Sequence, residues 1–256
     1  MTSSTKTIAC IILLTTIAGC ASQPRASSGR EIRPTQSHPG GYLAAPVAGK
    51  GTGVLVLHAW WGLNDTIKAF CLRLADAGFV AFAPDLYHGK VARTIPEAEA
   101  LGHALDEHYV KARAEVRAAT RFLVSQSVHS GQVAVMGFSL GAFYALDAAV
   151  QDPNDIHSVV VFYGTGGPMD FSRSKAAFMG HFAEKDPYNP PVDVDALESA
   201  LEKAKRPATF YHYPGTGHWF VEPDVKGAYN ESAASLAWKR TLRFLKERAS
   251  MPATVR

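Results

Sequence analysis

Ser139 lies in a Gly-x-Ser-x-Gly pattern that is typical of a nucleophilic serine. The five residues of the pattern are Gly137, Phe138, Ser139, Leu140 and Gly141. Apolar residues 133–136 precede it, as in a buried strand, and a helical pattern follows it. A serine on such a tight strand-to-helix turn is presented at the strand end, and the glycines let other backbone approach closely. The sequence therefore predicts that Ser139 is a nucleophile. The alternative is a non-catalytic strand-to-helix turn with a serine cap, which would have the same sequence pattern.

His218 is the histidine best placed to activate that serine. A serine hydroxyl is a poor nucleophile without an adjacent base. His218 follows the glycine-rich segment 215–217 directly after an apolar strand pattern that ends at Pro214. His212 lies within the strand pattern itself, where a packing role is expected. We therefore predict that His218 is the general base, and a loop histidine with local hydrogen bonds is the alternative.

Asp186 is the predicted acid of the same set. In this type of site the chain order is serine, acid, histidine, and the acid follows a strand. Asp186 lies just after the apolar run 176–182, where a carboxylate would hold the imidazole tautomer and stabilise its charged form. Aspartate is also common in solvated turns. Glu184, Asp193 and Asp195 remain competitors for this role.

Acyl transfer also requires donors for a negatively charged oxygen. The N–H of the residue after the nucleophile is the expected first donor, and a loop after an early strand supplies the second. These positions predict Leu140 and Trp60 as the two donors of an oxyanion hole. Trp60 and Trp61 are also candidates for the wall of an apolar substrate pocket, but ordinary packing explains two tryptophans equally well.

Apolar runs alternate with helical patterns along most of the chain. This alternation predicts an α/β fold with a doubly wound, mainly parallel sheet and helices on both faces. Such a sheet places its sites at the carboxyl ends of its strands, where the candidate residues fall. The expected strands are 54–58, 79–83, 133–138, 159–163, 176–182 and 209–213. The expected helices are 65–77, 96–108, 111–125, 140–150, 196–205 and 233–248.

The N-terminus is typical of a secreted bacterial lipoprotein. Lys6 precedes the apolar run 8–18, which is shorter than the roughly 20 residues of a membrane-spanning helix. The run ends in small residues before Cys20, which resembles a lipidation signal, although an ordinary signal peptide with a coincidental cysteine is the alternative. We expect a signal peptide at 1–19, a flexible tether at 20–41 and one domain at 42–256. The protein would then be lipid-anchored through Cys20 at a membrane of the bacterial cell envelope.

Composition limits the remaining possibilities. The formal charge of +3 comes without a dense Lys/Arg run, so no nucleic-acid partner is expected. We find no metal-ligand cluster and no phosphate-binding glycine loop, and serine chemistry needs no cofactor. Cys71, the one cysteine left after the predicted processing besides Cys20, is expected to be a small buried hydrophobe. The candidate serine chemistry leads us to expect a small-molecule ester as the partner, and we expect the protein to be a monomer.

Taken together, these motifs resemble the dienelactone hydrolase family of α/β-hydrolases. The resemblance covers roughly residues 53–245 and rests on segments 60–64, 83–87, 136–141, 184–187 and 215–218. It implies Asp186 as the acid and His218 as the base. It also implies a serine variant of the family, because the best-known member has a cysteine where this chain has Ser139. That member carries an activating glutamate where this chain has Ala59.

A further departure concerns the substrate. The resemblance expects a carboxylate-binding arginine where this chain has Glu222, which would repel a carboxylate. Neutral esters are therefore expected to be preferred over dienelactone. Glu222 pointing to solvent, with Arg93 reaching the substrate, is the alternative.

Two functions of different classes follow. The first is a serine hydrolase that cleaves small carboxylic esters through an acyl-enzyme, with thioesters and amides left open. The second is a lipid-anchored, non-catalytic binding protein on the same scaffold. The complete Ser–Asp–His set favours the enzyme, because a binding protein has no physical need for all three residues.

Overall fold

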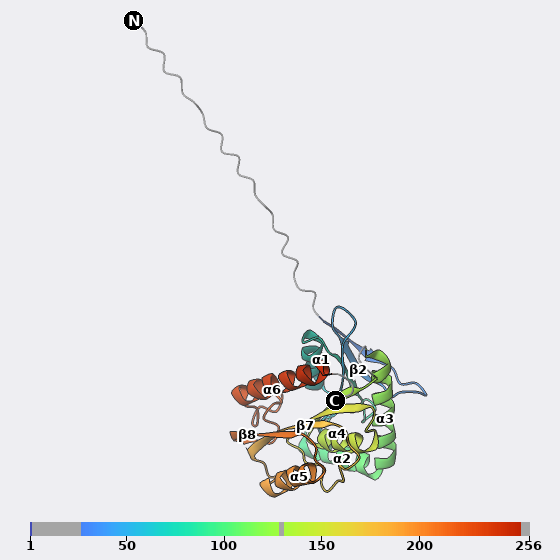
Figure 1. Cartoon of the computed structure of the whole chain (residues 1–256), viewed down its shortest axis with the longest axis vertical. Helices are drawn as coiled ribbons and strands as arrows, with labels where there is room; N and C mark the ends of the chain where they lie inside the picture. The colour runs from blue at the N-terminus through green and yellow to red at the C-terminus, as the bar shows by residue number, and fades with distance from the viewer. Residues whose placement is uncertain (2–26, 128–130, 252–256) are drawn as a thin grey trace.

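The sheet runs through the centre of the molecule. In the computed structural model, which describes Met1 and residues 27–127 and 131–251, eight strands form one sheet in the order β1-β2-β4-β3-β5-β6-β7-β8 (Figure 1). The strands are β1 (Ser28–Ile32), β2 (Gly41–Ala45), β3 (Gly53–Leu57), β4 (Val80–Pro84), β5 (Val133–Phe138), β6 (Ile156–Phe162), β7 (Ala177–Lys185) and β8 (Ala208–Gly217). All neighbouring pairs from β4 to β8 are parallel, and the pairings β1–β2 and β2–β4 are antiparallel.

Helices cover both faces of this sheet, and each face has its own apolar core. The helices are α1 (Asp65–Asp76), α2 (Ile95–Glu107), α3 (Tyr109–Gln126), α4 (Leu140–Gln151), α5 (Pro191–Lys203) and α6 (Glu231–Ser250). Helices α1 and α6 lie on one face of the sheet, and α2 to α5 lie on the other (Figure 1). The buried side chains of the two sets of helices belong to two separate apolar clusters. The doubly wound, mainly parallel α/β fold expected from the alternation of elements is confirmed.

The central strands are buried throughout and mostly apolar, because both of their faces are covered. Every residue of β3, β4, β5 and β6 is buried. Continuous apolar runs of this kind are the expected signature of a parallel sheet between two helical layers. The carboxyl ends of these strands therefore meet at one edge of a rigid core, where functional side chains are held by well-packed backbone.

The expected tether at 20–41 is wrong in its C-terminal part. Ser28–Ile32 forms β1, an edge strand that pairs with β2, so the folded domain extends to residue 28. Four of the five β1 residues are exposed, which explains why its sequence shows no apolar alternation. Cys20 and the signal segment lie outside the described residues, apart from Met1.

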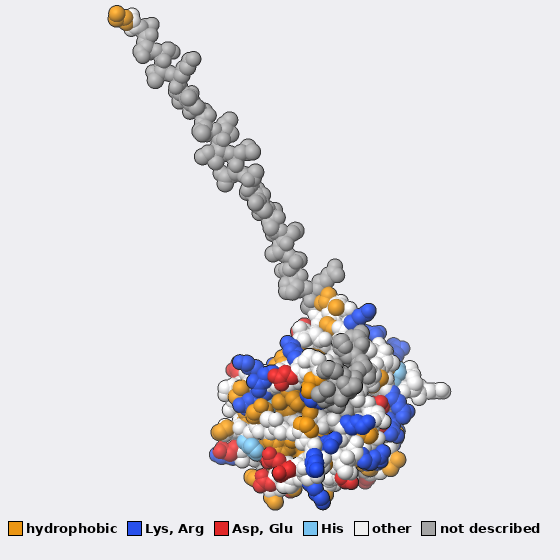
Figure 2. All heavy atoms as spheres, viewed as in Figure 1, with side chains coloured by type: hydrophobic (Ala, Val, Ile, Leu, Met, Phe, Trp, Pro, Cys, Tyr) orange, Lys and Arg blue, Asp and Glu red, His pale blue; other side chains and the backbone are white. Residues whose placement is uncertain are grey.

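The surface of the protein mixes charges of both signs. On the face drawn in Figure 2, lysine and arginine side chains gather over α6, with acidic side chains among and below them. Among the described residues, no helix is long and apolar enough to cross a membrane.

Candidate active site

A strained turn places Ser139 between β5 and α4. Ser139 has φ 50° and ψ −114°, a conformation that a residue with a side chain rarely adopts. Its backbone N–H donates to the carbonyl of Phe162 at the end of the adjacent β6, 2.9 Å away. A Cβ at Gly137 would collide with the Gly141 backbone, so the turn closes tightly only because position 137 is glycine. Strain of this kind is kept where the surrounding structure over-determines it, often at functional sites.

Ser139, His218 and Asp186 form a continuous chain of hydrogen bonds. The distance from Ser139 Oγ to His218 Nε2 is 2.8 Å, and that from His218 Nδ1 to Asp186 Oδ2 is also 2.8 Å. An ionised carboxylate only accepts, so Nδ1 carries the proton and Nε2 is left to accept from the serine hydroxyl. His218 and Asp186 are buried, and Ser139 is half-buried at the end of its strand.

Each member of this chain comes from the carboxyl end of a different strand. Ser139 follows β5, Asp186 follows β7, and His218 follows β8. Strand β8 runs to Gly217, further than expected, and its last residue pairs with Lys185 across an irregularity in the ladder. The expected glycine-rich loop is therefore the end of a strand that delivers the imidazole directly.

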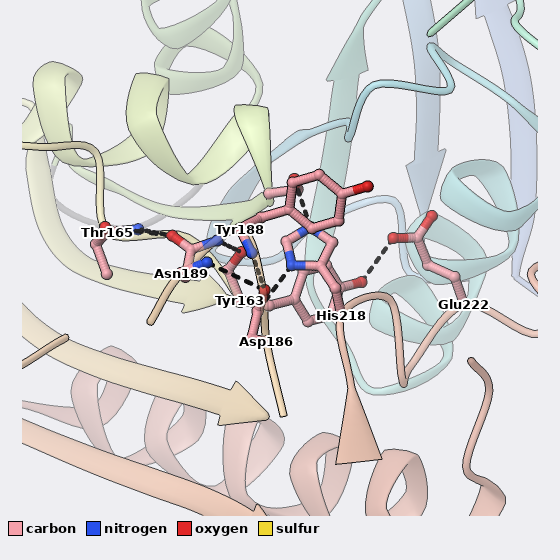
Figure 3. A network of polar contacts seen from close by, with 8 residues as sticks. Tyr163, Thr165, Asp186, Tyr188, Asn189, His218 and Glu222 are labelled. Atoms are coloured by element: carbon pink, nitrogen blue, oxygen red, sulfur yellow. Dashed lines mark hydrogen bonds and ion pairs between the residues drawn. The ribbon is translucent and has the colours of Figure 1, made fainter. Parts of the chain in front are cut away.

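Asp186 is held by its own loop, which Asn189 ties to the end of β6 (Figure 3). Asp186 Oδ1 accepts from the backbone N–H groups of Tyr188 and Asn189, at 2.9 and 3.1 Å. The Asn189 side chain accepts from the N–H and hydroxyl of Thr165 and donates to the Tyr163 carbonyl at 3.0 Å. Sequence reasoning missed Asn189, because the partners of its side chain lie more than twenty residues away and leave no local pattern.

The competing acids lie elsewhere. Glu184 is exposed, and its carboxylate accepts from the Gly215 N–H at the end of β8. Asp193 and Asp195 are exposed on α5. Of these candidates, Asp186 is the one whose carboxylate contacts the imidazole of His218.

The two predicted oxyanion donors lie on segments that meet beside Ser139. Leu140 begins α4, where a backbone N–H has no acceptor within its own helix. A Cβ at Gly141 would collide with the carbonyls of Leu57 and His58, so the start of α4 lies directly against the end of β3. Trp60 lies two residues after His58, in the loop that follows β3. Within the described part of the chain, neither the Leu140 nor the Trp60 N–H donates to a recorded backbone acceptor.

Aromatic rings surround the imidazole of His218. Tyr188 packs against His218 with 4.9 Å between ring centroids, and also contacts Trp60 and Trp219, at 5.7 and 5.3 Å. Trp61 packs against Trp219 at 5.5 Å. We call Trp60, Trp61, Tyr188 and Trp219 the aromatic wall. Tyr188 is 44% exposed and Trp60 is half-buried, so this wall reaches the surface beside the site.

Glu222 does not present a charge to this surface, contrary to the expected repulsion of a carboxylate. Its side chain is fully buried and accepts a 2.7 Å hydrogen bond from the Tyr163 hydroxyl (Figure 3). Burial raises the pKa of Glu222 to about 8, so the carboxyl is mostly neutral near pH 7. The alternative, in which Glu222 points to solvent, is also wrong, because its side chain is fully buried. The Tyr163 ring touches His218, at 4.9 Å between centroids.

The remaining candidates have no part in this hydrogen-bonded chain. Cys71 is buried on α1, and burial raises the pKa of its thiol, as for an inert hydrophobe. Arg93 is exposed before α2, where its backbone N–H donates to Glu97. A search of the described residues finds no group of three or more His, Cys, Asp or Glu that could hold a metal ion.

Comparison with known proteins places this architecture in one family. The model of the dienelactone hydrolase family matches residues 40–249. Protein usf of Aquifex pyrophilus is 34% identical over 214 residues, which cover 81% of this chain and 92% of that protein. Carboxymethylenebutenolidase of Pseudomonas sp. (strain P51) is 30% identical over 217 residues, covering 81% and 89%.

Solved structures agree with the fold. A dienelactone hydrolase-like promiscuous phosphotriesterase from metagenomic libraries superposes with a TM-score of 0.79 at 22% identity, covering 88% of this chain and 99% of that one. At this identity the likeness establishes the fold alone. The family match and the sequence relatives carry the assignment further: the chain belongs to the dienelactone hydrolase family and is a hydrolase.

Proposed function

We propose that this protein hydrolyses small carboxylic esters or lactones through an acyl-enzyme on Ser139. The observation that carries the proposal is the hydrogen-bonded chain from Ser139 through His218 to Asp186. The hydroxyl of a serine becomes a useful nucleophile only when a base can take its proton in the transition state. Nε2 of His218 is within hydrogen-bond distance of that proton, and Asp186 holds the ring in the tautomer that leaves Nε2 free to accept it.

The first half of the reaction forms the acyl-enzyme. Ser139 Oγ attacks the carbonyl carbon of the substrate while its proton passes to Nε2 of His218. The carbonyl oxygen becomes an oxyanion, for which the N–H groups of Leu140 and Trp60 are the proposed donors. The bond from the carbonyl carbon to the leaving oxygen then breaks, and the imidazolium returns its proton to that oxygen. With a lactone, the released alcohol stays attached to the acyl group.

The second half repeats these steps with water. Nε2 of His218 takes a proton from water, the resulting nucleophile attacks the acyl carbon, and the ester bond to Ser139 Oγ breaks. The proton returns to Oγ, and the carboxylic acid leaves. Asp186 remains ionised throughout and stabilises the imidazolium. Its second oxygen, Oδ1, accepts two backbone N–H groups, which hold the carboxylate in place against the ring.

The site also supports a class of substrate. The aromatic wall offers flat apolar surface beside His218. Glu222 is buried against the Tyr163 hydroxyl and mostly neutral near pH 7. The arginine that the family resemblance expects at position 222 is absent, so a substrate carboxylate gains no bidentate partner there. We infer that neutral esters are the preferred substrates, because a cationic partner is missing rather than because a charge repels.

The decisive test compares Ser139→Ala with a matched control, Ser235→Ala on the exposed surface of α6. Wild type and Ser235→Ala are expected to react with a fluorophosphonate probe and to hydrolyse p-nitrophenyl acetate. Folded Ser139→Ala is expected to lose labelling and about 10⁴- to 10⁶-fold in rate. Near-normal hydrolysis by Ser139→Ala would refute the assignment and favour another site. Absent activity and labelling in wild type would favour the non-catalytic binding protein.

A second test concerns substrate charge. We expect kcat/KM to be higher for a neutral ester than for a matched ester that carries a carboxylate. Glu222→Gln is expected to leave this ratio nearly unchanged at neutral pH, since the wild-type carboxyl is already mostly protonated. A wild type that favours the carboxylate ester would contradict the inference.

A further inference from the structure

His58 lies directly after β3 and is buried, with 1% of its surface exposed. Its Nδ1 lies 2.8 Å from the carbonyl oxygen of the next residue, Ala59. A carbonyl oxygen can only accept, so Nδ1 carries the ring proton. Burial lowers the pKa of His58, so the ring is neutral and Nε2 is unprotonated. Within the described residues Nε2 has no hydrogen-bond partner. The contact with Ala59 is thus the polar contact that the structure records for this imidazole.

The hydrogen bond acts on one peptide unit. The carbonyl of Ala59 and the N–H of Trp60 belong to the same planar trans peptide, in which the two groups point in opposite directions. A ring that holds the carbonyl therefore also determines where the Trp60 N–H points. The Gly62 N–H donates to the same carbonyl at 3.1 Å, so the turn and the imidazole hold it together. Without the imidazole, the Gly62 N–H alone holds this carbonyl, and the peptide is less firmly fixed about the soft dihedrals on either side of it.

We propose that His58 is a positioning residue that aims the Trp60 N–H into the oxyanion hole. The recorded polar and ring contacts of the His58 side chain are with the Ala59 carbonyl and with Tyr87, so it acts through the Ala59–Trp60 peptide. The contact of Gly141 with the Leu57 and His58 carbonyls brings this peptide to the start of α4, beside the Leu140 N–H. The inference rests on the proposed function, because a donor needs aiming only if an oxyanion forms.

The proposal predicts a loss in kcat rather than in KM. A misdirected donor weakens binding of the oxyanion, which exists only after the serine has attacked, and leaves substrate binding alone. Loss of one oxyanion donor commonly costs about 10²- to 10³-fold in kcat. His58→Leu removes the hydrogen bond that orients the Trp60 N–H but leaves the N–H itself in place. We therefore expect kcat to fall by roughly 10- to 100-fold, with KM little changed.

His58→Asn and Tyr87→Phe are the matched variants. His58→Asn places an amide N–H near the position of Nδ1 and is expected to restore most of kcat. The ring of Tyr87 packs against His58 at 4.8 Å, and its buried hydroxyl has no partner among the described residues. Tyr87→Phe therefore disturbs the same pocket without touching the Ala59 carbonyl, and kcat is expected to stay near the wild-type value.

The experiment measures kcat and KM for p-nitrophenyl acetate, together with binding of a boronic acid that mimics the tetrahedral adduct. Weaker boronate binding in His58→Leu, with recovery in His58→Asn, supports the proposal. A folded His58→Leu variant whose kcat is as high as that of Tyr87→Phe, near the wild-type value, would overturn the proposal. If Ser139→Ala were inactive at the same time, the proposed function would still stand; if Ser139→Ala were active, the function itself would have failed.

A spectroscopic measurement on the wild type keeps the test independent of how the variants fold. The ¹⁵N shifts of the His58 ring should report a neutral imidazole with the proton on Nδ1 at neutral pH, because burial lowers the pKa of this ring. A protonated ring at neutral pH, or a proton on Nε2, would overturn the proposal.

Discussion

Two buried acidic side chains are linked to the imidazole of His218: Asp186 directly, and Glu222 through Tyr163, whose ring packs on the imidazole. Asp186 accepts two backbone N–H groups in addition to the imidazole N–H, so its carboxylate is fixed beside the ring. Glu222 accepts from the Tyr163 hydroxyl alone, and its Oε2 has no partner among the described residues. Such a site favours the protonated form, so the two carboxyl groups do not compete for the positive charge that develops on His218.

The raised pKa of Glu222 makes stability depend on pH. In the unfolded chain this carboxyl ionises near pH 4.5, whereas in the folded protein it ionises near pH 8. Between these values folding takes up a proton, so the free energy of unfolding falls as pH rises from about 5 to about 8 and then levels off. Glu222→Gln lacks this term. We expect the stability of the wild type relative to the variant to decline by a few kcal/mol across that window.

Urea unfolding at several pH values measures the effect, and Tyr163→Phe is the control. Removing the Tyr163 hydroxyl takes away a hydrogen bond that lowers the pKa of Glu222, so the decline should extend to higher pH. A stability difference between wild type and Glu222→Gln that does not vary with pH would show that this carboxyl is ionised throughout.

Cys71 offers a simpler test at the same scale. Its thiol is buried on α1, and burial raises the pKa of the thiol, so the reactive thiolate is not formed near neutral pH. We expect thiol reagents to leave esterase activity unchanged, measured after long incubation with iodoacetamide. Inactivation that disappears in Cys71→Ser would contradict this expectation.

At the scale of elements, the site depends on how closely α4 approaches β3. A methyl group at position 141 would press on the backbone carbonyls of Leu57 and His58, which cannot give way as a flexible side chain would. We expect Gly141→Ala to cost about 1–3 kcal/mol of stability and to reduce kcat strongly, because the Leu140 and Trp60 donors move apart. Gly227→Ala is the control, since no atom lies within 4 Å of its added Cβ. Equal Tm and kcat in both variants would refute the argument.

The loop after β7 is a second element on which the site depends. Asn189→Ala removes the ties from this loop to Tyr163 and Thr165 and leaves the Thr165 N–H without its acceptor. We expect a loss of about 1–3 kcal/mol in stability and a fall in kcat of roughly tenfold, as Asp186 loses its fixed orientation. Asn154→Ala on the exposed surface is the matched control. A normal kcat in Asn189→Ala would mean that the backbone alone holds the acid.

At the scale of the whole molecule, we propose that a lipid on Cys20 anchors the domain to a membrane of the cell envelope. The support is the short apolar run that ends in small residues before Cys20. We expect Cys20→Ser to lose metabolic labelling by a fatty-acid analogue and to leave the membrane fraction, while the esterase activity per folded molecule is unchanged. Equal labelling of both forms would show that Cys20 is not the lipid site.

The sequence alone determined the fold class and the strand ends on which the site lies. Strands buried on both faces of a parallel sheet are mostly apolar, so most of each strand from β3 to β7 forms an apolar run between helical patterns. The tight turn at Ser139 requires glycines in fixed positions, so it too is a local pattern. β1 was not visible, because an exposed edge strand needs no apolar residues and gains its stability from pairing with β2.

Only the tertiary structure decided how the side chains around the site are oriented. From its residue type alone, a glutamate such as Glu222 is expected at the surface. In the fold it is buried against Tyr163, which lies 59 residues earlier in the chain. Asn189 and His58 likewise give no signal of their own. The role of Asn189 comes from hydrogen bonds to a distant loop, and that of His58 from the place where one peptide unit meets the start of α4. Periodicity and turn chemistry describe neighbours along the chain, whereas burial, pKa and the direction of an N–H group depend on atoms that folding alone brings together.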